Sequence, residues 1–424
     1  MMLKQALIDS FNEDLKKVYA NDSVKPVFAP FETLGKEIID HLPSLDGSIL
    51  VLSDCGLLIA LLLNNRTADI TFVAHTERQA EFARQVSVTK IIQIGYNDPI
   101  KELEKHLMGL KFDIIVGNPP YQPSISGGEE RAGSANSIWH KFSEISFNHL
   151  NDDGFLAFIT PPQWRIPTLA TKRDNYAVVR EFMAENHIIY LMTGAEKFFN
   201  LTIGIDAYVL KKRPATTSTT IRFFKHGDLT KELDLKRVVL PIKADDTTLS
   251  IISKISAHEG EKIKLVPSPG GFCIGKRYEH VSLERTSSFK YPMLANIFGG
   301  AVETGKVAWT DIAHPHQTSL KVLVPMDGRY VSFPFERGIY GLGIGVLCIP
   351  VNSIRAGEAL ASFLNSKVIK FFITSYQDRD QFKFPAYALQ LLPFLNSKKW
   401  TDAELYTHFK LTQEEIDLIE TTIK

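Results

Sequence analysis

Four consecutive residues, Asn118-Pro119-Pro120-Tyr121, carry the side chains whose types and spacing are best suited to chemistry. They follow an apolar run, Phe112–Val116, which predicts a buried strand that ends at a glycine. In open α/β sheets, ligands bind at the carboxyl ends of the strands. Two prolines in series stiffen the backbone and remove two N–H donors. Carbonyl oxygens and one side-chain amide are then left to face a ligand.

An amino group offers two N–H donors to such an arrangement. The side-chain oxygen of Asn118 can accept one of them, and the carbonyl of Pro119 can accept the other. Both hydrogen bonds draw the nitrogen out of conjugation and free its lone pair to attack an electrophilic methyl group. The ring of Tyr121 can stack on a planar base or amide. The alternative is an ordinary strand-ending turn, because Asn and Pro are common turn residues.

The elements that must position this motif alternate between strand and helix. Apolar runs predict strands over residues 49–52, 70–74, 91–94, 112–116, 154–159, 188–193 and 205–210. Helical periodicity predicts helices over residues 1–20, 33–41, 57–63, 77–86, 101–107, 138–150 and 176–185. This alternation indicates parallel βαβ units in a doubly wound α/β sheet.

The length of 424 residues favours two domains. A Thr- and Ser-rich stretch follows Pro214 and predicts a linker, so we place the first domain at residues 1–214 and the second at residues 221–424. Short β-like runs over residues 221–350, followed by helical patterns over residues 355–376 and 402–421, predict an α+β second domain. Basic residues outnumber acidic ones between Thr216 and Gln390, which makes this half the better candidate for contact with a polyanion.

Composition narrows the class of protein. A formal net charge of zero argues against a purely electrostatic nucleic-acid binder. The three cysteines, Cys55, Cys273 and Cys348, have neither metal-ligand spacing nor the density of a disulfide framework. No apolar run approaches the roughly 20 residues of a membrane span. We therefore expect a cytoplasmic protein with no bound metal and no membrane association.

The motif Asn118–Tyr121 resembles the catalytic motif of N6-adenine DNA methyltransferases of restriction–modification systems. The order of the motifs is similar to the gamma class, in which the cofactor motifs come first and the target-recognition domain last. The resemblance implies a Rossmann-like sheet that binds S-adenosylmethionine, followed by a C-terminal α+β domain that recognises double-stranded DNA. It also implies that the target adenine is flipped out of the duplex.

The resemblance extends to further site residues. The segment Val27-Phe28-Ala29-Pro30 is similar to the family's N-terminal cofactor motif, which implies that Phe28, Ala29 and Pro30 lie at the cofactor. In the family, an aromatic residue in a late hairpin sandwiches the flipped base against the motif tyrosine. The matching residue here is Phe199, with Phe198 as the alternative.

Acidic residues after the first three strands match the family's cofactor contacts. The first loop carries Asp54 and one glycine, Gly56, where the family has an acid and several small residues. Glu77 follows the second strand, where the family's acid holds the ribose hydroxyls, and His75 occupies a competing alignment. Asp98 follows the third strand and matches the acid that binds the cofactor's adenine amine. Asn118 completes the predicted cofactor contacts.

Two other functions stay open. The same Asn-Pro-Pro-aromatic chemistry suits a glutamine amide in a protein or an amine on an RNA base. The irregular first loop also suits a catalytically weak relative that binds DNA or a partner subunit. The sequence has no convincing nuclease cluster of carboxylates and lysine, so any restriction nuclease would be a separate chain. It does not reveal the DNA sequence recognised or the oligomeric state.

Overall fold

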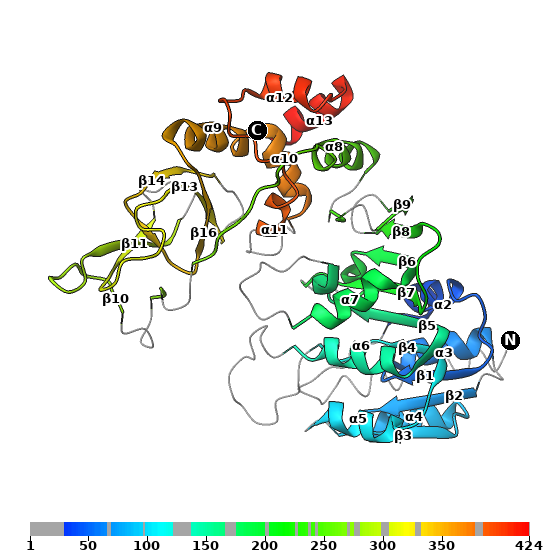
Figure 1. Cartoon of the computed structure of the whole chain (residues 1–424). Helices are drawn as coiled ribbons and strands as arrows, with labels where there is room; N and C mark the ends of the chain where they lie inside the picture. Colours follow the sequence, from blue (N-terminus) through cyan, green and yellow to red (C-terminus); the bar gives the residue numbers. More distant parts are fainter. Residues whose placement is uncertain are drawn as a thin grey trace. The chain divides into compact units, whose positions relative to one another are not determined.

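A computed structural model describes most of the chain. The described residues are 29–65, 69–95, 98–121, 137–165, 175–199, 203–224, 228–235, 239–241, 245–268, 272–274, 280–297, 305–326, 332–377 and 385–423. The helix predicted at residues 1–20 and the predicted cofactor residue Phe28 lie outside them. The chain forms two compact units that divide between Val239 and Leu240 (Figure 1).

The first unit is built on a nine-stranded sheet of order β3-β2-β1-β4-β5-β7-β6-β8-β9. Its strands are β1 (Ser48–Leu52), β2 (Asp69–Ala74), β3 (Lys90–Gln93), β4 (Phe112–Gly117), β5 (Leu150–Thr160), β6 (His187–Thr193), β7 (Asp206–Lys211), β8 (Thr219–Phe223) and β9 (Leu229–Leu233). The strands from β3 to β5 are parallel, whereas β7 is antiparallel to both β5 and β6. This topology confirms the predicted doubly wound sheet.

The helices of the first unit form two groups. The π-helical turn η1 (Phe31–Gly35), α2 (Lys36–Asp40), α3 (Cys55–Asn64) and α4 (Glu77–Gln85) contact one another in chain order. The second group contains α5 (Pro99–Leu107), α6 (Trp139–Asn148) and α7 (Ala177–Glu185). Two such groups, one for each face, explain why Ile49, Leu50, Val51 and Leu52 of β1 are all buried.

The first unit extends beyond the boundary predicted at Pro214. The Thr-rich stretch taken for a linker begins β8, which pairs in parallel with β6, and β9 pairs with β8. The side chains of Thr219, Ile221 and Phe223 alternate inward and are buried. Threonine suits a pleated, half-buried strand as well as it suits a loop. The predicted boundary was therefore wrong, and the first unit continues to Val239.

The second unit contains both strands and helices, which confirms the predicted α+β composition. One sheet has the order β10-β12-β11-β15 and another the order β14-β13-β16. The strands are β10 (Val281–Ser282), β11 (Tyr291–Asn296), β12 (Lys306–Thr310), β13 (Leu320–Pro325), β14 (Phe335–Arg337), β15 (Gly341–Leu342) and β16 (Val346–Pro350). The helices are α8 (Asp246–Ser256), α9 (Ile354–Leu364), α10 (Lys367–Ser375), α11 (Ala386–Leu389), α12 (Asp402–His408) and α13 (Gln413–Thr422).

Two helical features of the second unit differ from what its sequence pattern predicted. Helix α8 interrupts the region in which short β-like runs were expected, and Asp245 caps it by accepting a hydrogen bond from the Thr248 N–H. The long helical pattern near residues 355–376 is divided, because Ser366 caps the start of α10. Within the described part of both units, no helix has the length and apolar character of a membrane span.

Candidate functional site

Asn118 leaves the sheet at the carboxyl edge of the parallel strands. It directly follows β4, whose neighbours are β1 and β5. A Cβ atom on Gly117 would lie 2.9 Å from the side chain of Leu52 and 3.0 Å from that of Phe158. The strand therefore tolerates only glycine at its last position, which lets β4 lie close to its neighbours. As a result, Asn118 emerges beside the residues that follow β1.

A chain of hydrogen bonds joins Asn118 to three other predicted site residues. The Asn118 Nδ2 atom donates to Oδ2 of Asp54 at 3.2 Å, and the Tyr121 hydroxyl donates to Oδ1 of Asn118 at 3.1 Å. The backbone N–H of Ala29 donates to the same Asp54 oxygen at 2.9 Å. Segments that are far apart in the sequence thus meet in one polar group at the edge of the sheet.

Asp54 is the centre of this group and is 1% exposed. It also caps α3, because its Oδ1 accepts the backbone N–H of Leu57 at 2.8 Å. Burial raises the pKa of Asp54 to about 6, although N–H donors from Leu57, Ala29, Asn118 and Gly56 oppose the shift. The carboxylate has no cationic partner within the described part of the chain.

The loop between β1 and α3 contains only Ser53 and Asp54. Ser53 adopts a left-handed conformation with φ of 58°, which is uncommon for a residue other than glycine. The predicted cofactor residue Gly56 lies against the N-terminal segment, since a Cβ atom there would be 1.9 Å from the carbonyl oxygen of Ala29. Gly56 therefore allows residues 29 and 30 to cross the start of α3. The family's longer, small-residue loop is absent from this connection.

Gln79 is a site-edge residue that the sequence analysis missed. Its side-chain nitrogen donates to the carbonyl of Ser53 at 3.0 Å, and its oxygen accepts the N–H of His75 at 2.7 Å. The side chain therefore connects the residues that follow β1 with those that follow β2. The spacing of Thr76 and Gln79 is that of a capping box, and this signal could have identified the residue.

Two of the predicted cofactor carboxylates turn towards cations near their own helices. Glu77 begins α4, and its exposed carboxylate lies 2.8 Å from the Arg84 guanidinium. Asp98 caps α5 and lies 2.8 Å from the Lys101 ammonium. These neighbours lower the pKa of both carboxyls. Among the described contacts, neither carboxylate joins the group around Asp54.

His75 lies at the carboxyl end of β2, where the family's ribose-binding acid was expected. The side chain is buried, and its ring centroid lies 6.1 Å from that of Phe142 in an edge-on arrangement. Burial lowers the pKa of His75 to about 4, so the imidazole is neutral at physiological pH. His75 is thus buried at the end of β2, whereas the Glu77 carboxylate is exposed at the start of α4.

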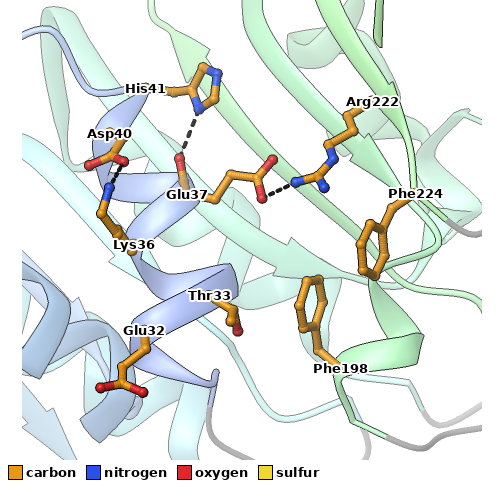
Figure 2. Close-up of a pocket in the computed structure, with 9 residues that line it drawn as sticks. All are labelled: Glu32, Thr33, Lys36, Glu37, Asp40, His41, Phe198, Arg222 and Phe224. Atoms are coloured by element: carbon orange, nitrogen blue, oxygen red, sulfur yellow. Dashed lines mark hydrogen bonds and ion pairs between the residues drawn. The ribbon is translucent and has the colours of Figure 1, made fainter. Parts of the chain in front are cut away.

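The two candidate aromatic residues after β6 have different surroundings. Phe199, Phe198 and Tyr121 are all partly buried and pack against the main hydrophobic cluster of the first unit. Phe198 stacks on Phe224, with ring centroids 4.6 Å apart and planes within 3°. It also lines a separate cavity beside α2 (Figure 2). Phe199 therefore stays the candidate partner for Tyr121.

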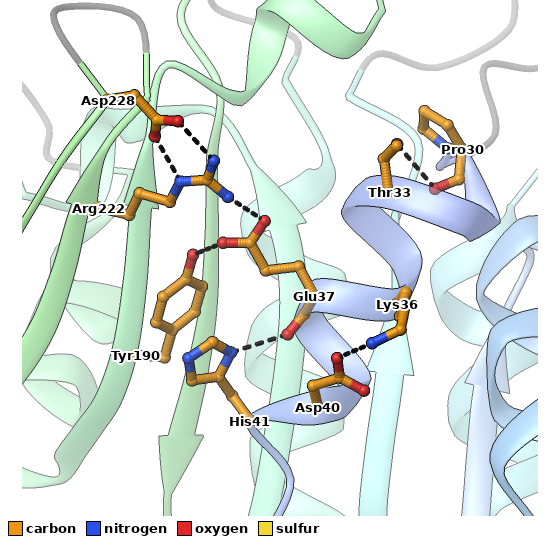
Figure 3. Close-up of polar contacts among 9 residues, drawn as sticks. All are labelled: Pro30, Thr33, Lys36, Glu37, Asp40, His41, Tyr190, Arg222 and Asp228. Carbon is orange, nitrogen blue, oxygen red and sulfur yellow. Dashed lines mark hydrogen bonds and ion pairs between the residues drawn. The ribbon is translucent and has the colours of Figure 1, made fainter.

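That separate cavity has a volume of about 520 Å³. It is lined by Glu32, Thr33, Lys36, Glu37, Asp40, His41, Phe198, Arg222 and Phe224 (Figure 2). Glu37 accepts hydrogen bonds from the Tyr190 hydroxyl and the Arg222 guanidinium, and Arg222 also pairs with Asp228 at 2.6 Å (Figure 3). These charges satisfy one another, which is typical of a structural network that joins α2 to β6 and β8.

Charge provides a test of whether the site around Asn118 suits the implied cofactor. S-adenosylmethionine carries a positively charged sulfur, and Asp54 is a buried carboxylate with no cationic partner among the residues described. A cation nearby would favour the ionised form of this carboxyl and offset part of its desolvation. The side chains present therefore fit a cationic cofactor. Within the described ranges, no three His, Cys, Asp or Glu side chains are grouped as metal ligands.

Comparisons with known proteins show which proteins this chain resembles. Residues 60–199 match the Eco57I restriction-modification methylase family, and this range includes both Asn118 and Phe199. The modification methylase CviBIII of Paramecium bursaria Chlorella virus NC1A is 29% identical over 119 residues, which cover 27% of this chain and 30% of that methylase. The predicted resemblance to restriction–modification methylases is confirmed, over a part of each chain.

Two solved structures show a more distant likeness. The DrdV–DNA complex aligns with a TM-score of 0.45 and 12% identity, covering 88% of this chain and 56% of that one. A protein from Listeria monocytogenes, described as a class I S-adenosylmethionine-dependent methyltransferase, aligns with a TM-score of 0.37 and 15% identity. That alignment covers 51% of this chain and 70% of the Listeria protein.

Proposed function

We propose that this chain, which resembles the restriction–modification methylases, transfers a methyl group from S-adenosylmethionine to the N6 amino group of adenine in a specific DNA sequence. The observation that carries the proposal is the setting of Asn118. Its amide nitrogen is bonded to a buried carboxylate at the carboxyl edge of β4, and its amide oxygen lies on the side of Tyr121. That oxygen can accept an N–H from a flat amine stacked on the tyrosine ring.

The chain's own residues account for the activation of the amine. Asn118 Oδ1 accepts one N–H of the amino group, and the carbonyl of Pro119 accepts the other. The nitrogen lone pair, withdrawn from the ring, forms the new bond to the methyl carbon, while the bond from that carbon to the sulfonium breaks and its electron pair stays on sulfur. The nitrogen then loses one proton, and it needs no strong base because the alkylated amine is acidic. When bound, S-adenosylmethionine supplies the methyl group, and Ala29, Pro30 and the start of α3 would lie beside it.

Adenine inside a duplex cannot reach this edge, so the target base must be extruded. We propose that Phe199 and Tyr121 hold the flipped base between their rings, since both side chains pack on the same hydrophobic cluster. The second unit, from Leu240 onward, would then supply the contacts to base edges that select the sequence. In this scheme double-stranded DNA is the partner.

The test is transfer of labelled methyl from S-adenosylmethionine to DNA, RNA or protein, with the modified product identified by mass spectrometry. N6-methyladenine in DNA, absent with Asn118→Ala, is the expected result. Label in RNA or in glutamine side chains would instead identify one of the alternative substrates. Failure of the wild-type protein to bind S-adenosylmethionine would contradict the proposal and favour a non-catalytic DNA- or partner-binding relative.

A further inference from the structure

We propose that Asp54 is a positioning residue for Asn118, because its carboxylate holds the Asn118 amide with Oδ1 directed at the substrate amino group. The inference rests on the proposed function and concerns the same site. It gives Asp54 a task different from the cofactor contact that the family resemblance implies. Asp54 touches no reacting atom in this scheme and acts only through Asn118.

The first argument is that most of the acceptor capacity of Asp54 is already used. An ionised carboxylate has about four lone-pair positions. On one oxygen, Leu57 donates its N–H at 2.8 Å. On the other oxygen, Ala29 donates at 2.9 Å and Asn118 at 3.2 Å. These three bonds leave about one lone-pair position for any cofactor hydroxyl or amine.

The second argument is that Asn118 needs an external group to select its orientation. The two ends of an asparagine amide have nearly the same shape, but one donates and the other accepts. If the amide turned by half a rotation, its NH2 group would face the N–H donors of the substrate. The Tyr121 hydroxyl does not decide the orientation, because a phenol can donate or accept. The ionised carboxylate of Asp54 only accepts, so it keeps Nδ2 on its own side.

The third argument concerns what happens when Asp54 is protonated. A protonated carboxyl gains an O–H donor, which can bond to Oδ1 of Asn118 and stabilise the reversed amide. Burial raises the pKa of Asp54 to about 6, so this exchange falls within an accessible pH range. The titratable neighbours are Cys55 and Tyr121, and their own pKa values are raised by burial and by Asp54. Both stay neutral near pH 6.

The structure also contains a group that competes with the substrate for Asn118. The Tyr121 hydroxyl occupies Oδ1 of Asn118 at 3.1 Å, which is the atom that should accept the substrate N–H. The hydroxyl therefore competes with an entering amino group for this oxygen, which has two lone pairs and can accept from both donors or exchange one for the other. Asp54 lies on the opposite end of the amide, so its hydrogen bond can persist during that exchange.

The experiment compares Asp54→Ser with a matched control, Asp245→Ser. Serine is a good N-cap residue, so both variants can keep the cap of their helix, but serine is too short to reach Asn118 or Ala29 as well. We expect Asp54→Ser to lower kcat between about tenfold and about a hundredfold, the range for one lost hydrogen bond to a charged group. The dissociation constant for S-adenosylmethionine should rise by a smaller factor than kcat falls, because Asp54 is not a direct ligand of the cofactor in this scheme. Asp245→Ser should retain wild-type kcat.

A double-mutant cycle with Asn118→Ala identifies the path of the effect. If Asp54 acts through Asn118, adding Asp54→Ser to Asn118→Ala should cause no further loss of kcat. Fully additive losses would overturn the inference. So would a weaker affinity for S-adenosylmethionine with unchanged kcat, because that pattern belongs to a cofactor ligand. Circular dichroism establishes that each variant is folded.

A spectroscopic test separates this inference from the proposed function. In protein labelled with 15N-asparagine, the side-chain NH2 signal absent from Asn118→Ala belongs to Asn118. In the wild type this signal should shift with a midpoint near the Asp54 pKa of about 6, and in Asp54→Ser it should not titrate. A signal that is independent of pH in the wild type would overturn the inference. The measurement remains informative even if no methyl transfer is detected, in which case only the proposed function fails.

Discussion

Replacement of Asn118 by aspartate tests both its acceptor role and its contact with Asp54. The introduced carboxyl would place an oxygen where Nδ2 now lies, 3.2 Å from Oδ2 of Asp54. Two ionised carboxylates are unfavourable at this distance in a buried site, so the pair should hold one proton. With the proton between the two groups, the second oxygen of the introduced carboxyl can still accept an N–H from the substrate. The variant then resembles the wild-type asparagine.

The distance between the two carboxyl groups determines how strongly each one shifts the pKa of the other. At 3.2 Å and an effective dielectric constant of about 20, two unit charges repel by roughly 5 kcal/mol. One pKa unit corresponds to about 1.4 kcal/mol, so the second ionisation of the pair would be delayed by about 3 to 4 units. The pair should therefore keep its proton at neutral pH and lose it only in alkaline solution, as a coupled system.

We expect Asn118→Asp to retain methyl transfer near neutral pH and to lose it progressively as the pH rises. Asn118→Ala should be impaired at every pH, because loss of the acceptor costs about 2–4 kcal/mol of transition-state stabilisation. The measurement is kcat with labelled S-adenosylmethionine from about pH 6 to about pH 10. The wild type is measured over the same range as a control for any loss of activity at alkaline pH that does not involve residue 118. A flat profile for Asn118→Asp, or wild-type turnover by Asn118→Ala, would refute the reasoning.

Other perturbations have distinct expected results. Tyr121→Phe keeps the ring but removes the hydroxyl that competes for Oδ1 of Asn118. Its kcat/KM should therefore rise, by up to about tenfold, the worth of one neutral hydrogen bond. A fall in kcat/KM would contradict this competition. Phe199→Ala should weaken binding of DNA with an extrahelical 2-aminopurine by about 1–3 kcal/mol, measured by fluorescence, and leave calorimetric cofactor affinity unchanged. A fragment ending at Val239 should unfold cooperatively by circular dichroism, whereas one ending at Pro214 should not, because it lacks β8 and β9. The raised pKa of Asp54 makes its ionisation unfavourable in the folded state. The free energy of unfolding should therefore fall by up to about 3 kcal/mol as the pH rises from about 4 to about 6. Urea denaturation should show the wild type gaining stability on acidification relative to Asp54→Ser, and an opposite trend would contradict the assigned shift.

Local sequence patterns were sufficient to predict most strands and helices of the first unit. Short apolar runs predicted the buried strands, and amphipathic periodicity predicted the helices between them. Both patterns can be recognised from the sequence because each depends only on residues within one element. The run over 112–116 thus predicted β4 and the place of Asn118 at its end. The linker predicted after Pro214 failed for the opposite reason. A Thr-rich stretch can form either a loop or a strand. Here it forms a strand because it pairs with β6, which is distant in the sequence.

The sequence by itself determined which groups can do chemistry, namely an amide and an aromatic ring placed after a buried strand by two prolines. Only the tertiary structure decided what those groups contact. Parallel pairing of β1 with β4 brings Asp54 to Asn118 across 64 residues of sequence, whereas Glu77 and Asp98 turn to cations near their own helices. All three are acids that follow a strand, and no local pattern distinguishes them. The difference arises because the direction of a side chain at a helix start depends on the chain packed against it, which for Asp54 is the Ala29 segment.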